Sequence, residues 1–111
     1  MLPKPHRLPS PLVRQVMRTG KRIATPQFQL IFSKNSLGVP RFAFIVGNNI
    51  DKRATARNRM KRLLRESVHH LLPHVASGWD GVFLVKAKLG DKKQTEVEPV
   101  VRGLLEQASL L

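Results

Sequence analysis

The spacing of hydrophobic residues changes along this chain of 111 residues, and the change limits the folds open to it. Alternate residues are hydrophobic in 27–32 and again in 41–46, as in strands that bury one face. Between residues 54 and 72 they recur every three or four positions instead, which is typical of an amphipathic helix that Pro73 ends. Segment 81–87 is an almost continuous hydrophobic run and predicts a strand inside a sheet. Strands and helices in this order indicate an α/β fold.

The first twenty residues predict a short lead-in and a helix. Residues 1–9 contain three prolines and several basic side chains, and we expect an extended segment. Ser10 as N-cap and Pro11 as first helical residue mark a helix start, and Gly20 marks its end.

A last helix is expected near the C-terminus. Its start is open between two signals: Thr95 and Glu98 as a capping box, or Pro99 as the first helical residue. Its hydrophobic stripe comprises Val97, Val101, Leu104, Leu105 and Ala108.

The predicted order is helix, two or three strands, helix, strand, helix. Strands 27–32 and 41–46 are expected to pair as an antiparallel hairpin with a long loop around Asn35 to Gly38. The result is an α/β (α+β) two-layer sandwich with a small mixed sheet. The sequence has no internal repeat or low-complexity segment, so a single domain spanning 1–111 is expected.

The net charge indicates the kind of partner. Twenty Lys and Arg residues against seven Asp and Glu give a formal charge of +13. Residues 1–66 hold fifteen basic and two acidic side chains, whereas residues 67–111 hold five of each. A folded domain with this self-repulsion is expected to bind a polyanion. Membrane binding is the weaker alternative, because the only tryptophan, Trp79, lies far from the basic region.

Composition argues against several other classes. The chain has no cysteine, which excludes a disulfide, a thiol nucleophile and a thiolate zinc site. No hydrophobic stretch approaches the roughly 18 residues that a membrane span needs. The basic N-terminal residues have no hydrophobic run behind them, which argues against a secretory signal peptide. We therefore expect a cytoplasmic protein without membrane contact.

The helix expected between residues 54 and 72 has two distinct faces. At about 100° per residue, the hydrophobic face comprises Ala56, Met60, Leu63, Leu64 and Leu71. The opposite face comprises Arg57, Asn58, Lys61, Arg62 and Arg65, with Arg59 at its edge. An ordinary solvated face mixes charges, whereas like charges four residues apart destabilise an isolated helix. Phosphate groups would remove this repulsion, so the pattern favours RNA or DNA binding.

The segment from Arg57 to Glu66, with the sequence RNRMKRLLRE, resembles the RNR signature of the bacterial ribonuclease P protein component family. The order of the flanking elements resembles that family over nearly the whole chain. The resemblance implies a left-handed crossover around the signature helix. It also implies a small basic subunit bound to ribonuclease P RNA, in an enzyme that releases the 5′ leader of precursor tRNA. Mg²⁺ would act with the RNA subunit, and the protein alone would bind no cofactor.

The resemblance also implies residue roles. The leader side would be lined by Asn58, Lys61 and Arg65. The RNA subunit would be bound by Arg57, Arg59 and Arg62, and the expected RNA-binding set is completed by Lys52 and Arg53. A leader cleft would contain Val13, Met17, Arg22, Gln29 and Ile31. The chain departs from the family in having Val13 and Met17 where aromatic residues are usual, and Asn48 and Asn49 where a Lys pair is usual.

The sequence offers no catalytic site of its own. It has no Gly-rich phosphate loop and no pair of carboxylates spaced for acid–base chemistry. His69, His70 and His74 lie close together, but Pro73 interrupts the spacing that a shared metal would need, and solvated helix-end histidines are the favoured interpretation. We expect no metal site, no catalytic residue and no obligate protein partner. The alternatives are a structural RNA-binding protein, such as a small ribosomal protein, and a general nucleic-acid-binding module.

Overall fold

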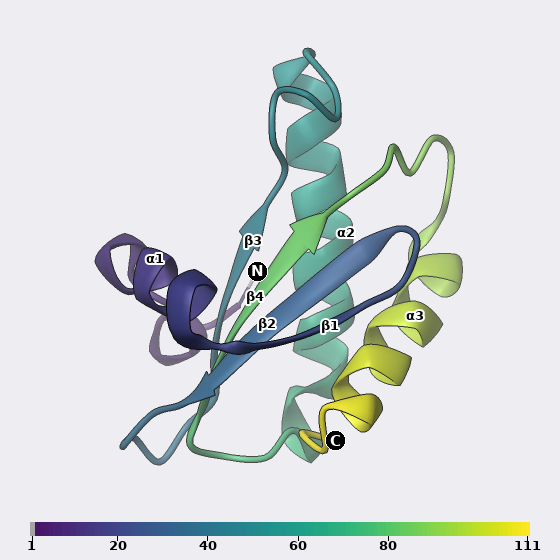
Figure 1. Cartoon of the computed structure of the whole chain (residues 1–111). Coiled ribbons are helices and arrows are strands. Elements are labelled where there is room, and N and C mark those ends of the chain that lie inside the picture. Colours follow the sequence, from purple (N-terminus) through teal and green to yellow (C-terminus); the bar gives the residue numbers. More distant parts are fainter. Residues whose placement is uncertain (1) are drawn as a thin grey trace.

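The computed structural model describes residues 2–111, so Met1 of the expected lead-in lies outside the described residues. Figure 1 shows a twisted sheet with helices on both faces. The elements in chain order are η1 (Lys4–His6), α1 (Ser10–Thr19), β1 (Lys21–Ala24), β2 (Phe28–Lys34), β3 (Arg41–Ile45), α2 (Ala54–Leu71), η2 (Leu72–His74), β4 (Trp79–Val85) and α3 (Gln94–Gln107).

The sheet has the strand order β1-β2-β4-β3. β2 is antiparallel to both β1 and β4, and β3 is parallel to β4. The predicted hairpin of 27–32 with 41–46 is therefore wrong, because β4 lies between these two strands. The hydrophobic run of β4 correctly indicated an interior strand, because residues on both faces of β4 are buried and β4 lies between β2 and β3. The optional third strand is β1.

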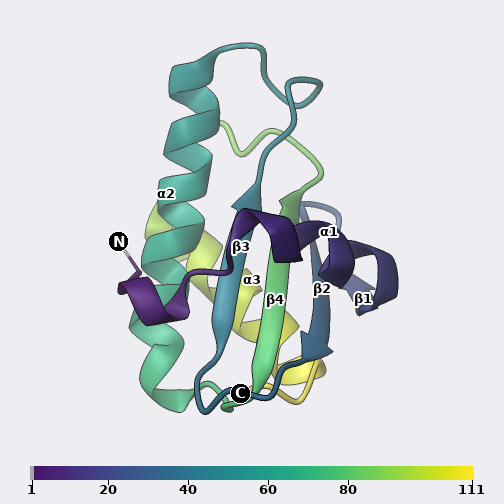
Figure 2. The same ribbon diagram turned by 90° about the vertical axis from the view of Figure 1, so that its left-hand side faces the viewer.

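The connection from β3 through α2 to β4 is left-handed. Figure 1 places α2 on the side of the sheet opposite α1. In Figure 2, with α1 in front of the sheet, β3 and β4 both run upwards and β4 lies to the right of β3. About 98% of such crossovers are right-handed, so the handedness here is the rare one that the family resemblance implied.

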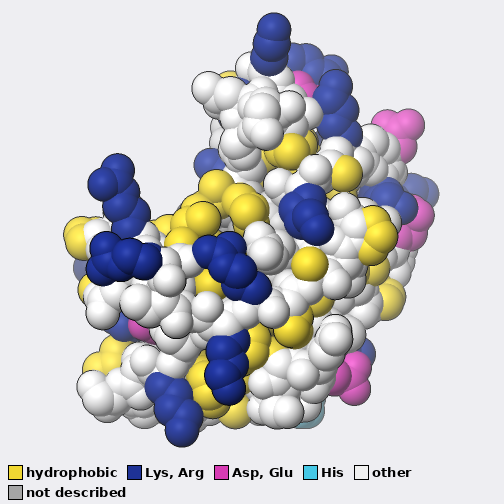
Figure 3. Space-filling view, in the orientation of Figure 1, with side chains coloured by type: hydrophobic (Ala, Val, Ile, Leu, Met, Phe, Trp, Pro, Cys, Tyr) yellow, Lys and Arg dark blue, Asp and Glu magenta, His cyan; other side chains and the backbone are white. Residues whose placement is uncertain are grey.

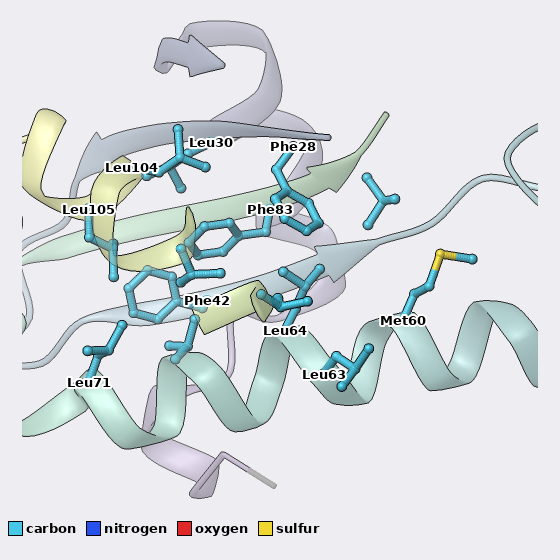
Figure 4. Packing of buried hydrophobic residues seen from close by; sticks show 14 of the residues in the cluster. Phe28, Leu30, Phe42, Met60, Leu63, Leu64, Leu71, Phe83, Leu104 and Leu105 are labelled. Atoms are coloured by element: carbon cyan, nitrogen blue, oxygen red, sulfur yellow. The ribbon is translucent and has the colours of Figure 1, made fainter. Parts of the chain in front are cut away.

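Most of the core lies between the sheet and helices α2 and α3, as Figure 4 shows. Phe28, Leu30 and Phe32 point from β2 into this core, as the alternation predicted. The buried residues of α2 are Met60, Leu63, Leu64, Ser67, Val68 and Leu71. Those of α3 are Val97, Val101, Leu104 and Leu105. The sheet with these two helices forms the predicted two-layer sandwich, and α1 covers part of the other face.

The two ends of the chain differ from their predicted boundaries. The N-terminal segment forms the short helix η1, and it buries Leu2 and Leu8 instead of remaining a plain extended lead-in. The N-cap of α1 is Pro9 rather than Ser10, and no side chain caps this helix.

None of the helices in the described part of the chain is long and hydrophobic enough to cross a membrane.

Helix α3 starts earlier than either proposed signal. Its N-cap is Lys93, whose backbone N–H donates to a carboxylate oxygen of Glu96 over 3.2 Å. Thr95 and Pro99 both lie inside the helix. The capping contact of Glu96 and the burial of Val97 against the core both favour a helix that begins ahead of Pro99.

Candidate nucleic-acid interface

The basic face of α2 lies on the side of the helix away from the core. Asn58 and Arg62 are exposed, and Arg57, Lys61 and Arg65 are half-buried. None of the ion pairs found among residues 2–111 includes any of these cations. The positive charge of this face is therefore not neutralised by a neighbouring carboxylate, which is the electrostatic condition for binding phosphate groups.

The leader side and the RNA-subunit side of this face are not separated in space. Asn58 and Arg65 were assigned to the leader, and Arg62 to the RNA subunit. All three line one pocket of about 290 Å³, together with Glu66. The two sets of residues thus meet along a shared boundary on α2.

Two arginines of the signature also hold the protein's own backbone. Nη1 of Arg57 donates to the carbonyl oxygens of Asp51 and Lys52, over 3.0 and 2.8 Å. Nη1 and Nη2 of Arg59 donate to the carbonyl oxygens of Gly90 and Lys92, over 2.9 and 2.7 Å. These bonds hold the residues just before α2, and the loop between β4 and α3, in place against α2. Arg57 and Arg59 therefore have a positioning role that the sequence did not indicate.

An ion pair orders the start of α2. The buried carboxylate of Asp51 accepts hydrogen bonds from the backbone N–H of Arg53, over 2.9 Å, and from its Nε and Nη2, over 3.1 and 3.0 Å. The side-chain hydrogen bonds from Arg53 are the main reason that the pKa of Asp51 lies well below its usual range. The same contact raises the pKa of Arg53. The positive charge of Arg53 is thus neutralised by Asp51, whereas Lys52 is exposed without an ion-pair partner among the described residues.

Asp51→Asn is expected to lower the melting temperature at pH 7. The difference in melting temperature between the variant and the unchanged protein is expected to shrink as the pH falls below about 4. The pKa of Asp51 is lower in the folded than in the unfolded protein, where it is near 3.8. Its contribution to stability is therefore fully present above the unfolded value and disappears as the pH falls through the folded value. Thermal unfolding of both proteins, followed by circular dichroism between pH 7 and pH 2, measures the difference. The exposed Asp91→Asn is the matched control, and equal pH dependence in Asp51→Asn and the unchanged protein would contradict this role.

The second candidate surface is the face of the sheet that α1 partly covers. The buried cluster beneath α1 consists of Leu8, Val16, Ile31 and Val82. Val13 and Met17 pack half-buried at its margin. Figure 3 shows the surface hollowed next to α1, with hydrophobic side chains exposed in the hollow and Lys and Arg side chains around it. A basic rim around a hydrophobic floor suits a single-stranded nucleic acid.

The five residues expected in the leader cleft do not all reach this surface. Gln29 is half-buried and lies opposite Leu84 of β4. Arg22 is exposed, and its guanidinium donates to the carbonyl oxygen of Met17, which ties β1 to the last turn of α1. Ile31 is 0% exposed beneath α1, so it supports the floor and cannot contact a ligand here. Strand alternation identifies the face of a residue but not the helix that covers it.

Comparison with known proteins identifies the family. The family model described as Ribonuclease P matches residues 2–109. A ribonuclease P protein component of Synechococcus sp. is 33% identical over 116 aligned residues, which cover the whole chain and 87% of that protein. The chain belongs to the bacterial ribonuclease P protein family. A second member, from Pelotomaculum thermopropionicum, is 34% identical over 86% of the chain and 85% of its own length.

Solved structures of ribonuclease P proteins have the same fold. A mutant RNase P protein of Staphylococcus aureus superposes with a TM-score of 0.87 over 97% of this chain and 92% of its own, at 19% identity. The RNase P protein of Thermotoga maritima gives 0.80 over 91% and 96%, at 26% identity. The left-handed β3–α2–β4 crossover thus belongs to a fold already seen in ribonuclease P proteins.

Membership of this family decides between the interpretations left open by the sequence. Ribonuclease P is an endoribonuclease in which the RNA subunit is catalytic, and this chain is its protein subunit in tRNA 5′ maturation. Its partner is ribonuclease P RNA. The matches give no support to a ribosomal protein or a general nucleic-acid-binding module.

The histidines of the ribonuclease P protein are not gathered around a common point. Nδ1 of His70 lies 2.9 Å from a carboxylate oxygen of Glu98, a contact that joins α2 to α3. His69 is exposed on α2, and His74 lies in η2. Among residues 2–111, no group of three or more His, Asp or Glu side chains is placed to hold a metal ion.

One polar cluster next to α1 was not anticipated from the sequence. The carboxylate of Asp80 accepts hydrogen bonds from Nε and Nη2 of Arg41, over 2.9 and 2.8 Å, and from Nδ2 of Asn35, over 2.7 Å. Arg41 and Asp80 are register partners in the parallel β3–β4 pair. The hydrogen bond to Asp80 raises the pKa of Arg41. The cluster could not be predicted because the sequence pattern did not reveal that β3 and β4 are neighbours.

Proposed function

We propose that this ribonuclease P protein binds the single-stranded 5′ leader of precursor tRNA while it is bound to the RNA subunit. The leader would contact Asn58, Lys61 and Arg65 and the cleft beside α1. The RNA subunit would contact Arg62 and Lys52, next to the backbone that Arg57 and Arg59 hold in place. The chain would work in the cytoplasm, where precursor tRNA is processed.

The observation that supports this proposal most strongly is the unneutralised positive face of α2. Arg57, Lys61 and Arg65 follow one another at intervals of four residues, a spacing at which like charges repel. No described carboxylate forms an ion pair with any of the three. RNA phosphates would replace this repulsion with attraction, and release of counterions from the RNA would add to the binding free energy.

The cleft is suited to electrostatic more than to stacking contacts. Its margin on α1 carries Val13 and Met17, so it lacks the aromatic rings that stack on bases there. Base stacking on an aromatic ring contributes roughly 1–3 kcal/mol per base. We infer that the leader is bound in the cleft by Arg22 and hydrogen bonds to Gln29, with hydrophobic contacts to the floor.

Mg²⁺ is assigned to the RNA subunit. The described residues of the chain offer no cluster of carboxylates or histidines that fits a catalytic metal ion. Metal ions held by the RNA would activate water for attack on the phosphodiester. The protein residues bind and orient the substrate, and none of them takes or gives a proton in the reaction.

Reconstitution tests this function. Adding the chain to ribonuclease P RNA and precursor tRNA at low Mg²⁺ concentration is expected to increase the rate of 5′ cleavage. The chain alone, rigorously freed of RNA, is expected to cut neither RNA nor DNA. Binding to the RNA subunit without any gain in cleavage would contradict the proposal, and so would Mg²⁺-dependent cleavage by the RNA-free protein.

A further inference from the structure

A small pocket lies at the edge of β3, on the α2 side of the sheet rather than beside α1. It has a volume of about 180 Å³ and is lined by Leu2, Arg7, Phe42, Phe44 and Arg65. The N-terminal segment forms one wall because it runs alongside β3. There the backbone N–H of Leu8 donates to the carbonyl oxygen of Phe42 over 2.9 Å, and Arg7 forms a parallel bridge with Phe42.

Two arginine side chains line this pocket, and each has one contact from Nε to a backbone carbonyl oxygen. Nε of Arg7 donates to the carbonyl oxygen of Leu2 over 2.9 Å, and Nε of Arg65 points to the carbonyl oxygen of Lys61 at 3.4 Å. No described carboxylate forms an ion pair with either arginine. Neither arginine uses its Nη groups in a hydrogen bond within the described residues, and a guanidinium with free Nη groups can bind phosphate oxygens through paired hydrogen bonds.

An aromatic ring lines the same pocket as the two arginines. Phe44 is half-buried, whereas its neighbour Phe42 is only 2% exposed. The ring of Phe44 is stacked on the fully buried Phe83, with 5.9 Å between ring centroids and 9° between planes. This packing fixes the orientation of the ring, so little side-chain entropy would be lost on binding a ligand.

We propose that this pocket binds one unpaired nucleotide of the 5′ leader, with its base against Phe44 and its phosphate between Arg7 and Arg65. The inference rests on the proposed leader function. A pocket that combines an aromatic ring with guanidinium groups has the chemistry that binds unpaired nucleotides. Pockets for drug-sized ligands measure about 300–1,000 Å³, so this smaller pocket suits a single base.

The leader is favoured over the RNA subunit because of where Arg65 lies. Arg65 is one helical turn from Lys61, on the same side of α2 as Asn58. A single strand that follows these side chains along α2 reaches the pocket at Arg65. The pocket also provides the aromatic contact that Val13 and Met17 do not provide in the cleft.

Phe44→Leu tests the proposal, because it keeps a hydrophobic side chain and removes the ring. In holoenzyme reconstituted with ribonuclease P RNA, this variant is expected to bind precursor tRNA about tenfold more weakly, within the range for loss of one stacked base. Its affinities for mature tRNA and for the RNA subunit are expected to stay within twofold. Phe44→Tyr keeps the ring and is expected to bind precursor tRNA about as tightly as the unchanged protein does. Phe28→Leu, at a buried position of β2, controls for a general loss of stability.

A series of precursor tRNAs with leaders of different lengths provides a second test. As leader nucleotides are removed one at a time from the 5′ end, the effect of Phe44→Leu is expected to vanish at one particular length. An equal loss with mature tRNA, a loss of affinity for the RNA subunit, or no loss at all would each overturn the proposal. If the unchanged chain gives no preference for precursor over mature tRNA, the proposed function fails; if it does and Phe44→Leu has no effect, only the pocket assignment fails.

Discussion

Leu64→Asp is expected to abolish the cooperative thermal unfolding transition of the domain. Leu64 is 0% exposed on α2 and lies in the centre of the core between this helix and the sheet (Figure 4). Truncation of a buried leucine costs about 2–5 kcal/mol. An unpaired carboxylate in the same place adds several kcal/mol more, and domains of this size have a total stability of about 5–15 kcal/mol.

Circular dichroism during heating measures this effect, and a second variant on the same helix controls for it. Arg62→Asp also introduces an aspartate into α2, but at an exposed position where it relieves repulsion between cations. It is expected to melt close to the unchanged protein. A native-like transition for Leu64→Asp would show that α2 does not pack on the sheet through this face.

Local periodicity was sufficient to predict the helices and most of the strands. Helix α2 was expected between residues 54 and 72 and spans Ala54–Leu71, because its hydrophobic spacing and Pro73 are both local signals. The neighbours of each strand were not predictable in the same way. β4 enters the sheet between β2 and β3 only after the chain has passed through α2, so no sequence neighbour of either strand reveals this pairing.

The charge of the candidate interface was predictable, but the use of each side chain was not. The angular positions along α2 gave the basic face directly. The partners of Arg59, in contrast, lie 31 and 33 residues further along the chain, in a loop without a periodic signal. Ile31 was placed on the correct face of β2, yet the position of α1 over it depends on tertiary packing.

The paired substitution Lys61→Ala with Arg65→Ala is expected to weaken binding of precursor tRNA to the holoenzyme about 10- to 100-fold. Each lost phosphate contact removes a charge-assisted hydrogen bond and lowers the salt dependence of binding by about 0.7 to 0.9 units. Binding of mature tRNA is expected to change little, because it has no leader. The matched pair is Lys52→Ala with Arg62→Ala, which changes the same number of charges and leaves Arg57 and Arg59 in place. This pair is expected to weaken assembly with the RNA subunit instead.

The affinities of both pairs for the RNA subunit, precursor tRNA and mature tRNA should be measured across a series of salt concentrations. If each pair lowers all of these affinities equally, α2 is an undivided basic surface and the residue assignments are wrong. Asn58, Arg62 and Arg65 line one pocket, so residues assigned to the leader and to the RNA subunit are neighbours there. The two pairs of substitutions therefore test whether the two RNAs contact different side chains of this pocket.

The ratio of the mature to the precursor tRNA dissociation constant tests the central claim most directly. It should be measured for ribonuclease P RNA alone and for the same RNA with this chain, under conditions that prevent cleavage. Contact between the chain and the leader predicts that the ratio rises when the chain is added and falls back with Lys61→Ala and Arg65→Ala. A ratio that is the same with and without the chain would contradict leader binding by this protein.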